Sequence, residues 1–223
     1  MRRALVLAGG NFDPLVLDGI SLDDTRIVCV DRGLEHAMAA SLAPDLIIGD
    51  LDSVSPELLA SPAFLDVPRL VFPADKDASD LELALVTLAD DTRHVGPIDE
   101  VVVAGVSGGR TDHLLFNWLL PASRAWPFGL RLIDATVEAS VVTPDRPLTL
   151  PTTPGQTVSL LPIGPAHGVT ADGLHYALSD ATLEPGATVG LSNRAVAAHV
   201  TVSIAGGVLL ALATRAGNAG ASP

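Results

Sequence analysis

Three acidic clusters in this chain combine residue types that could perform chemistry. They read Gly49-Asp50-Leu51-Asp52-Ser53, Asp75-Lys76-Asp77-Ala78-Ser79-Asp80 and Gly108-Gly109-Arg110-Thr111-Asp112-His113. Carboxylates are the ligands of a hard divalent cation such as Mg²⁺, which completes its coordination with waters and substrate phosphates. Glycine N–H groups, a lysine and an arginine are suited to holding the phosphates themselves. The combination predicts phosphoryl-group chemistry.

The metal ligands predicted from this pattern are Asp50, Asp52 and Asp80. Asp50 and Asp52 are two residues apart on a turning backbone, so both carboxylates can face one cation. An isolated Asp-x-Asp is more often a helix cap beside a solvated charge, and Asp80 would also complement the dipole of the helix that it begins. The second acidic cluster and Gly49 favour the metal interpretation.

A glycine-rich turn is predicted between a strand and a helix at Gly105-Val106-Ser107-Gly108-Gly109-Arg110. Its N–H groups and the helix N-terminus form an anion site, to which Arg110 adds a bidentate phosphate contact. Lys76 is predicted to reach a phosphate as well. The chain contains neither a Walker loop nor a Gly-x-Gly-x-x-Gly fingerprint. We expect His113 to act in a structural or supporting role, and the dispersed histidines do not indicate zinc.

The first 135 or so residues alternate apolar runs with helical patterns, which is typical of an α/β fold with a parallel sheet. The predicted helices are 32–42, 80–89 and 111–120, and the predicted strands are 4–8, 26–31, 45–48, 69–72, 101–105 and 129–134. Asp31 and the three clusters each follow a strand. Ligands of open α/β sheets bind at the carboxyl ends of the strands, so we expect these residues to converge on one edge.

The composition changes in the second part of the chain. Four prolines between 144 and 154 interrupt any helical period, and short β-type runs follow at 157–161, 188–191, 199–204 and 208–212, with Gly206-Gly207 in a hairpin-like context. We therefore predict an α/β catalytic domain at 1–136, a small all-β, sandwich-like domain at 137–215 and a flexible tail at 216–223.

Composition limits the classes of function. The net charge of −13 argues against a nucleic-acid binder, which would show a basic face. The apolar runs are too short for a membrane span. A single cysteine, Cys29, lies in an apolar run and excludes a disulfide framework, which suits a reducing compartment. We expect an enzyme of the cytoplasm that binds neither nucleic acid nor membrane.

Taken together, these motifs resemble the thiamine pyrophosphokinase family. The resemblance runs through 44–54, 75–82 and 108–113, and continues at 158–162 and 190–193, so that it spans nearly the whole chain. It implies a Rossmann-like catalytic domain followed by a β-sandwich-like domain. It also implies a homodimer with thiamine bound between the subunits, and Mg²⁺-dependent transfer of diphosphate from ATP to the thiamine hydroxyl, giving thiamine diphosphate and AMP.

The resemblance also implies roles for individual residues. The implied catalytic residues are Asp31, Asp52, Asp80, Arg110 and Asp112, with Asp31 matching the aspartate of the family's Asp-Gly-Gly motif. The implied nucleotide-binding residues are Gly49, Ser53, Lys76, Ser107, Gly108, Gly109 and Arg110. Ser192 and Asn193 match the thiamine-side motif. Asp112 and Asp31 are both candidates to accept the proton of the alcohol.

Two features depart from the family pattern. The chain reads Asp31-Arg32-Gly33-Leu34-Glu35 where the family has Asp-Gly-Gly-Ala-Asn. The side chain of Arg32 would either block close backbone approach or add a phosphate contact. The predicted β domain contains no tryptophan to stack on thiamine, and Tyr176 is its only aromatic residue.

Three other functions fit part of the pattern. The same chemistry could act on another hydroxyalkyl heterocycle, such as a hydroxymethylpterin. The acidic clusters alone would also allow a metal-dependent phosphohydrolase. A nucleotide-binding regulator without activity ranks last, because it would not need three clustered carboxylates.

Overall fold

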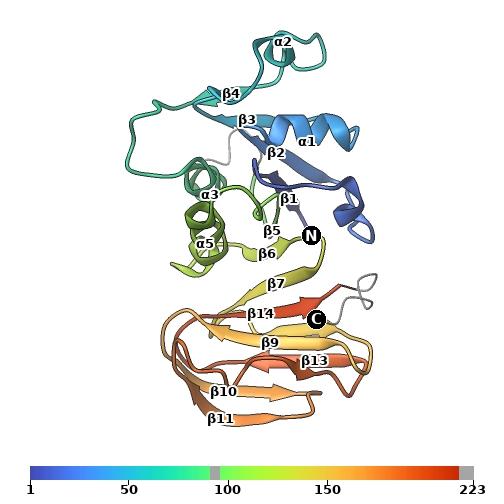
Figure 1. The fold of residues 1–223 in the computed structure, drawn as a ribbon, viewed down its shortest axis with the longest axis vertical. Coiled ribbons are helices and arrows are strands. Elements are labelled where there is room, and N and C mark those ends of the chain that lie inside the picture. Colours follow the sequence, from blue (N-terminus) through green and yellow to red (C-terminus); the bar gives the residue numbers. More distant parts are fainter. Residues whose placement is uncertain (91–95, 216–223) are drawn as a thin grey trace. The chain divides into compact units, whose positions relative to one another are not determined.

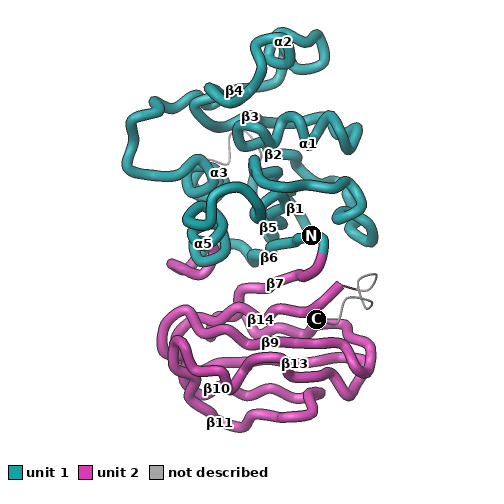
Figure 2. Tube along the Cα trace, in the orientation of Figure 1, with its two compact units in different colours: residues 1–120, 126–135 teal, residues 121–125, 136–223 magenta. Residues whose placement is uncertain are grey.

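The computed structural model describes residues 1–90 and 96–215, and the predicted tail at 216–223 lies outside them. The chain divides into two compact units, coloured separately in Figure 2. Unit 1 comprises residues 1–120 and 126–135, and unit 2 comprises residues 121–125 and those from 136 onward. No helix in the described part of the chain is long and apolar enough to cross a membrane.

Unit 1 is built on six parallel strands. They are β1 (Arg3–Leu7), β2 (Thr25–Val30), β3 (Leu46–Gly49), β4 (Arg69–Val71), β5 (Glu100–Ala104) and β6 (Gly129–Ile133). Their order across the sheet is β6-β5-β1-β2-β3-β4, and every neighbouring pair is parallel. All six predicted strands are confirmed, each to within one residue at both ends.

The helices of unit 1 connect these strands (Figure 1). They are α1 (Gly33–Ala39), α2 (Pro56–Leu59), α3 (Asp80–Asp90) and α5 (Thr111–Leu119), with short 3₁₀ helices η1 (Pro14–Leu17) and η2 (Leu120–Ala122). Three of these were predicted, although the first ends at Ala39 rather than at residue 42. Ser79 caps the start of α3, since its Oγ accepts a hydrogen bond from Glu82 N at 3.2 Å.

Both faces of the central strands are buried. Leu5 and Leu7 of β1 share an apolar cluster with Leu34 and Ala37 of α1, whereas α3 packs against β2 and β3. Figure 1 shows α1 and α3 on opposite sides of the sheet. Gly33 lets α1 approach closely, because a Cβ there would overlap the carbonyl of Leu7.

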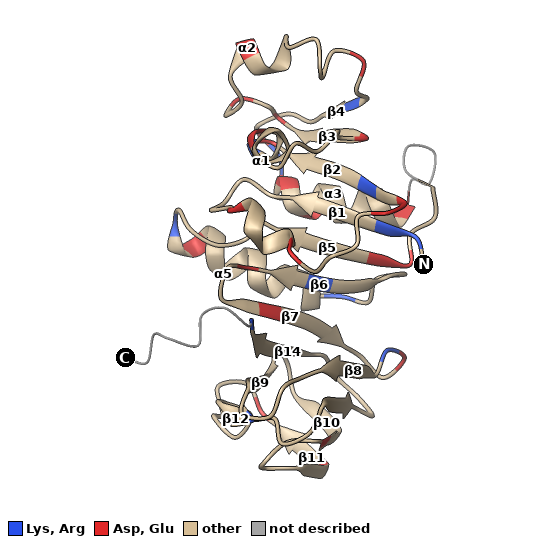
Figure 3. Ribbon diagram, turned by 90° about the vertical axis from the view of Figure 1, so that its right-hand side faces the viewer, with Lys and Arg blue, Asp and Glu red and all other residues tan. Residues whose placement is uncertain are grey.

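The amino ends of the strands carry positive charge that is already compensated. Figure 3 shows blue segments at the starts of β1 and β2. Three arginines gather at this edge, and each pairs with an acid: Arg2 with Asp99, Arg3 with Glu100 and Arg26 with Asp45. These three arginines are therefore committed to structural ion pairs.

Unit 2 consists of antiparallel strands in two sheets. The strands are β7 (Val137–Val142), β8 (Leu148–Pro151), β9 (Thr157–Pro162), β10 (Ala166–Asp172), β11 (Leu178–Leu183), β12 (Asn193–Arg194), β13 (His199–Ser203) and β14 (Leu209–Thr214). One sheet contains β12-β9-β14-β7 in that order, and the other contains β11-β10-β13-β8. Side chains of both sheets, among them Val158 and Val200, share one hydrophobic core.

Two predictions for this region were wrong. Residues 188–191 form a turn rather than a strand, because Gly190 packs directly against the carbonyl of Leu160 and Ser192 turns the chain with a φ of +55°. Gly206-Gly207 is not the turn of a hairpin. The strands on either side of it, β13 and β14, pair in different sheets, so this segment carries the chain from one sheet to the other.

Candidate active site

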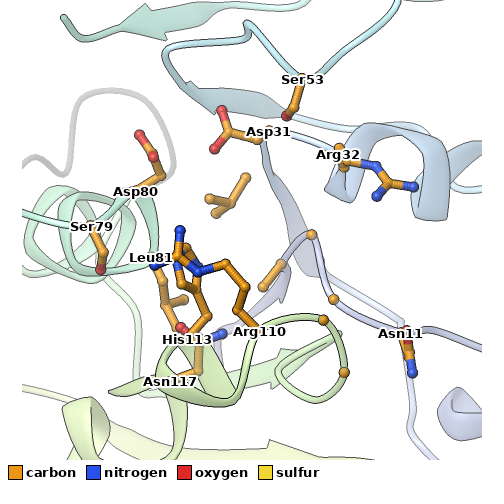
Figure 4. A pocket seen from close by; sticks show the side chains of 16 residues that line it. Asn11, Asp31, Arg32, Ser53, Ser79, Asp80, Leu81, Arg110, His113 and Asn117 are labelled. Atoms are coloured by element: carbon orange, nitrogen blue, oxygen red, sulfur yellow. The ribbon is translucent and has the colours of Figure 1, made fainter. Parts of the chain in front are cut away.

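A pocket of about 480 Å³ opens at the carboxyl ends of the parallel strands of unit 1 (Figure 4). The strand order reverses between β1 and β5, which is the position where open α/β sheets bind their ligands. The residues after β1, β2 and β5 line the pocket together with the start of α3. The lining includes Asp31, Ser53, Asp80, Gly108, Gly109 and Arg110, so six predicted site residues meet in one cavity.

Asp31 is held at the end of β2 in an unusual conformation. Its φ is +46°, and its Oδ1 accepts a hydrogen bond from Leu51 N at 3.2 Å. Gly49 makes this position possible, because a Cβ on Gly49 would overlap the carboxylate of Asp31. Gly49 therefore leaves the space that the carboxylate of Asp31 occupies, and Asp31 lines the pocket.

The carboxylates of Asp31 and Asp80 face one another across the pocket in Figure 4. Burial, followed by the negative charge of Asp80, raises the pKa of Asp31 from 3.8 to about 7. The hydrogen bond from Leu51 opposes this rise, and the charge of Asp50 adds to it. Near neutral pH, Asp31 can therefore both hold and release a proton.

Lys76 bridges two predicted metal ligands. Its ammonium lies 3.0 Å from Asp80 Oδ1 and 3.5 Å from Asp50 Oδ2, and its side chain is 14% exposed. Lys76 is the only lysine in the chain, and all other basic side chains are arginine or histidine. A cation thus already lies between Asp50 and Asp80.

Asp50 and Asp52 lie together beside Lys76. Asp50 Oδ1 accepts a hydrogen bond from Asp52 N at 3.2 Å. Partial burial acts to raise the pKa of Asp50, but the hydrogen bonds from Asp52 and the charge of Lys76 outweigh it and lower the pKa. The neighbouring carboxyl of Asp50 raises the pKa of Asp52. Within residues 1–90 and 96–215, no three acidic, His or Cys side chains are already arranged to hold a metal ion.

The glycine-rich turn is joined to the segment that follows β1. Gly10 N donates to Gly105 O at 2.8 Å, and Asn11 N donates to Ser107 O at 2.6 Å. Gly108 has a φ of +92°, and a Cβ there would overlap the side chain of Asn11. The turn therefore needs glycine both for its backbone angle and for its contact with Asn11.

Arg110 and Asp112 form a bidentate ion pair at the start of α5. The two contacts are Nε to Oδ1 at 3.1 Å and Nη2 to Oδ2 at 2.6 Å. The hydrogen bonds from Arg110 lower the pKa of Asp112 to about 2. Arg110 lines the pocket, whereas Asp112 is not part of its lining. Asp112 therefore orients the arginine and remains ionised at neutral pH.

Arg32 does not close the pocket. Its guanidinium pairs with Glu35 at 3.2 Å, its side chain is half exposed, and it points away from Asp31 and Asp80 in Figure 4. Cys29 behaves as the predicted core residue, because burial raises the pKa of its thiol to about 12.

The polar residues of the pocket that were not predicted as site residues include Asn11, His113 and Asn117. His113 and Asn117 are four residues apart and so share one face of α5. This spacing is visible in the sequence and could have indicated that both side chains face the same pocket. Asn11 follows β1. Because ligands of open α/β sheets bind at the carboxyl ends of the strands, the sequence could also have indicated Asn11 as a site residue.

Ser192 and Asn193 lie in unit 2 and differ in exposure. Ser192 is exposed, whereas Asn193 is only 4% exposed. Asn193 Nδ2 donates to Tyr176 O at 2.8 Å, and Asn193 Oδ1 accepts from Tyr176 N at 3.1 Å and from Arg194 N at 2.9 Å. The amide of Asn193 thus holds the backbone of Tyr176, whose side chain is 67% exposed.

Two family models match the chain. The thiamin pyrophosphokinase catalytic domain matches residues 21–122, and the thiamin pyrophosphokinase vitamin B1 binding domain matches residues 147–209. The two segments follow one another in the chain without overlap and together cover most of it.

Individual relatives agree with these models. Thiamine pyrophosphokinase of Bacillus subtilis (strain 168) is 29% identical over 219 residues, which are 94% of this chain and 97% of the relative. A crystal structure of thiamin pyrophosphokinase from Geobacillus thermodenitrificans has a TM-score of 0.75 and 28% identity, covering 98% of this chain and 99% of its own. The crystal structure of the Bacillus subtilis enzyme has a TM-score of 0.79 at 24% identity, covering 96% and 99%, which shows a shared fold.

Proposed function

Because the chain belongs to the thiamine pyrophosphokinase family, we propose that the pocket of unit 1 transfers a diphosphate group to the hydroxyl of thiamine, a transferase reaction. The family uses ATP as its co-substrate. One observation carries the assignment to this pocket. Two carboxylates, an arginine and a glycine-rich turn meet at the carboxyl edge of the sheet, where its strand order reverses.

Each unit has a proposed role. Unit 1, corresponding to the predicted domain 1–136, is a Rossmann-like catalytic domain, which the parallel sheet and its reversal of strand order support. Unit 2, corresponding to 137–215, is a sandwich-like domain, which the shared core of its two antiparallel sheets supports. It contributes the thiamine side of the site through Ser192, Asn193 and Tyr176, in a homodimer that binds thiamine between its subunits.

Asp50, Asp52 and Asp80 are the proposed Mg²⁺ ligands. Their donors are hard oxygens, as magnesium requires, and the ammonium of Lys76 between Asp50 and Asp80 indicates that these two carboxylates attract a cation. A bound Mg²⁺ would neutralise part of the charge on the polyphosphate during transfer. The ammonium of Lys76 would then turn from the carboxylates toward a phosphate oxygen.

The side chains of the pocket perform the remaining steps. The N–H groups of the glycine-rich turn and the guanidinium of Arg110 hold the phosphates in line with the thiamine hydroxyl. The hydroxyl oxygen bonds to the β-phosphorus, the bond from that phosphorus to the α-phosphate oxygen breaks, and AMP leaves. Asp31 is the proposed acceptor of the hydroxyl proton, because it lines the pocket, whereas Asp112 is paired with Arg110 outside the lining.

Incubation of the protein with MgATP and thiamine tests this proposal. We expect AMP and thiamine diphosphate to form in equal amounts. AMP formed only with a hydroxymethylpterin would reassign the acceptor, and phosphate released without any acceptor would indicate a hydrolase. Binding of ATP without turnover would indicate a regulator.

Asp52→Asn tests the metal ligands in the same assay. We expect turnover to fall by orders of magnitude while the thermal unfolding curve is retained, because Asp52 is exposed and supports no packing. Near-normal activity of this variant would contradict the metal assignment.

A further inference from the structure

His36 lies outside the lining of the pocket but is bonded to a residue that belongs to it. The side chain belongs to α1 and is partly buried. Its Nε2 lies 2.8 Å from the carbonyl oxygen of Gly10, which follows β1 and lines the pocket. A carbonyl oxygen only accepts hydrogen bonds, so the imidazole must donate through Nε2. His36 therefore ties α1 to the backbone of the segment after β1.

A second contact orients the imidazole of His36. Its ring is stacked on Phe12, with ring centroids 4.9 Å apart and an angle of 26° between the planes. Burial lowers the pKa of His36 from its usual 6.5, and the hydrogen bond to Gly10 and the charge of Glu35 oppose this only in part. The ring is therefore neutral at pH 7 and carries its one proton on Nε2.

The backbone that His36 holds is bonded in turn to the glycine-rich turn. Gly10 N donates to Gly105 O at 2.8 Å, and Asn11 N donates to Ser107 O at 2.6 Å. Position 10 needs glycine for this approach, because a Cβ there would overlap both of these carbonyl oxygens. The two segments thus meet through backbone atoms, and a shift of Gly10 would move the turn with it.

Helix α1 also carries the other half of the site. Asp31, which lines the pocket, lies just before the helix begins at Gly33. Gly33 packs the start of α1 directly against the backbone of β1, at the carbonyl of Leu7. The helix is therefore attached to β1 at its first residue and to the segment after β1 through His36. These two attachments fix Asp31 relative to the glycine-rich turn.

We propose that His36 is a positioning residue, whose hydrogen bond to Gly10 holds the glycine-rich turn where its N–H groups meet the polyphosphate. His36 itself contacts no substrate and acts through the backbone of Gly10 and Asn11. The proposal rests on the proposed function, because it takes the turn to be the phosphate site. Transfer requires the phosphates to be held in line with the attacking hydroxyl, so a displaced turn slows the reaction as well as weakening binding.

Two substitutions separate the hydrogen bond of His36 from its ring. His36→Phe replaces a neutral ring by another that can stack on Phe12, but it has no donor for Gly10 O. His36→Gln loses the ring but supplies an amide N–H donor in place of Nε2. Met38→Ala is the control, because Met38 belongs to the same helix, is 56% exposed and does not line the pocket.

Calorimetric titration with inorganic tripolyphosphate and Mg²⁺ measures the phosphate site directly. We expect His36→Phe to weaken binding by about tenfold, near the upper end of what one hydrogen bond contributes, and the other two variants to bind as the wild type does. In steady-state kinetics, His36→Phe should raise the KM for ATP and lower kcat, while the KM for thiamine stays unchanged. A merely structural role would lower the unfolding temperature without this selectivity.

Wild-type binding of tripolyphosphate by His36→Phe would overturn the proposal. Equal weakening in His36→Phe and His36→Gln would also overturn it, because the effect would then come from ring packing, as would a wild-type protein that does not bind tripolyphosphate. If His36→Phe does not fold, His36→Gln carries the test alone, since weakened binding in that variant would contradict the hydrogen bond as the cause. These results do not depend on turnover, so a protein that shows the expected binding but forms no thiamine diphosphate would contradict the proposed function alone.

Discussion

The carboxylate of Asp31 occupies the space in which a side chain at position 49 would begin. Gly49 ends β3, and Asp31 follows β2, the neighbouring strand. The missing Cβ of Gly49 therefore makes room for the carboxylate with the raised pKa, which lines the pocket. A residue without a side chain thus determines the position of a reactive group on another strand.

Gly49→Ala should displace Asp31 and reduce kcat/KM by about a hundredfold, the cost of moving a catalytic group by roughly 1 Å. The measurement is steady-state formation of thiamine diphosphate. Gly19→Ala is the control, because Gly19 also has a positive φ but nothing lies near a Cβ there. Activity of the Gly49 variant equal to that of the control would contradict the role of Asp31.

Lys76→Met should lower the free energy of unfolding by about 1 kcal/mol in the absence of divalent cations, because Asp50 and Asp80 lose a shared partner. Added Mg²⁺ should restore more stability to the variant than to the wild type, since the ammonium no longer competes for the same oxygens. Thermal unfolding with EDTA or Mg²⁺ measures both effects. Arg32→Met is the control, because it removes a more exposed ion pair. The loss of stability in this variant should be the same in EDTA and in Mg²⁺. An identical response of Lys76→Met and the wild type to Mg²⁺ would contradict the shared site.

Most strands of unit 1 could be predicted from the sequence because they are short apolar runs that end at, or just before, an acid or a glycine. The runs Leu46–Gly49 and Glu100–Ala104 are examples. In unit 2, β7, β8, β10, β11 and β12 were not predicted. The sequence of β11 (Leu178–Leu183), Leu-Ser-Asp-Ala-Thr-Leu, has little apolar character, and this strand lies at the edge of its sheet. The segment 188–191 resembles a strand locally, but contacts of Gly190 with β9 make it a turn.

Some features of the candidate site could likewise be predicted from the sequence, and others could not. The convergence of Asp31 and Asp80 follows from the position of each after a parallel strand, which sequence patterns predict. The ion pair of Lys76 with Asp50 and the contact of Asn11 with Gly108 join residues distant in the chain. Such contacts depend on side-chain packing in three dimensions, and no local pattern contains them.

The stability of the wild-type protein without divalent cations should decrease as the pH rises through about 7. The pKa of Asp31 is raised from 3.8 to about 7, so the folded state holds its proton more tightly than the unfolded state. The resulting stabilisation is complete below pH 3.8 and is lost as the pH rises through 7. Mg²⁺ should therefore stabilise the protein more at pH 8 than at pH 5. Asp31→Asn should flatten the profile in EDTA, and an unchanged profile in this variant would show that another group is responsible.

Ser192→Ala and Asn193→Ala should separate contact with thiamine from positioning of Tyr176. Ser192 is exposed, so its variant should raise the KM for thiamine without changing stability or the KM for ATP. Asn193→Ala removes three hydrogen bonds and leaves backbone groups of Tyr176 without their partner, which should cost about 2–3 kcal/mol of unfolding free energy. It should also raise the KM for thiamine, because Tyr176 is no longer held.

Tyr176→Ala completes this series. Since the Tyr176 side chain is exposed, its removal should leave stability nearly unchanged and raise the KM for thiamine as much as Asn193→Ala does. Val189→Ala, which shortens another exposed side chain of unit 2, is the control. Steady-state kinetics with each substrate varied in turn, together with thermal unfolding, distinguish the two roles. A normal KM for thiamine in both Ser192→Ala and Tyr176→Ala would place thiamine recognition outside this part of unit 2.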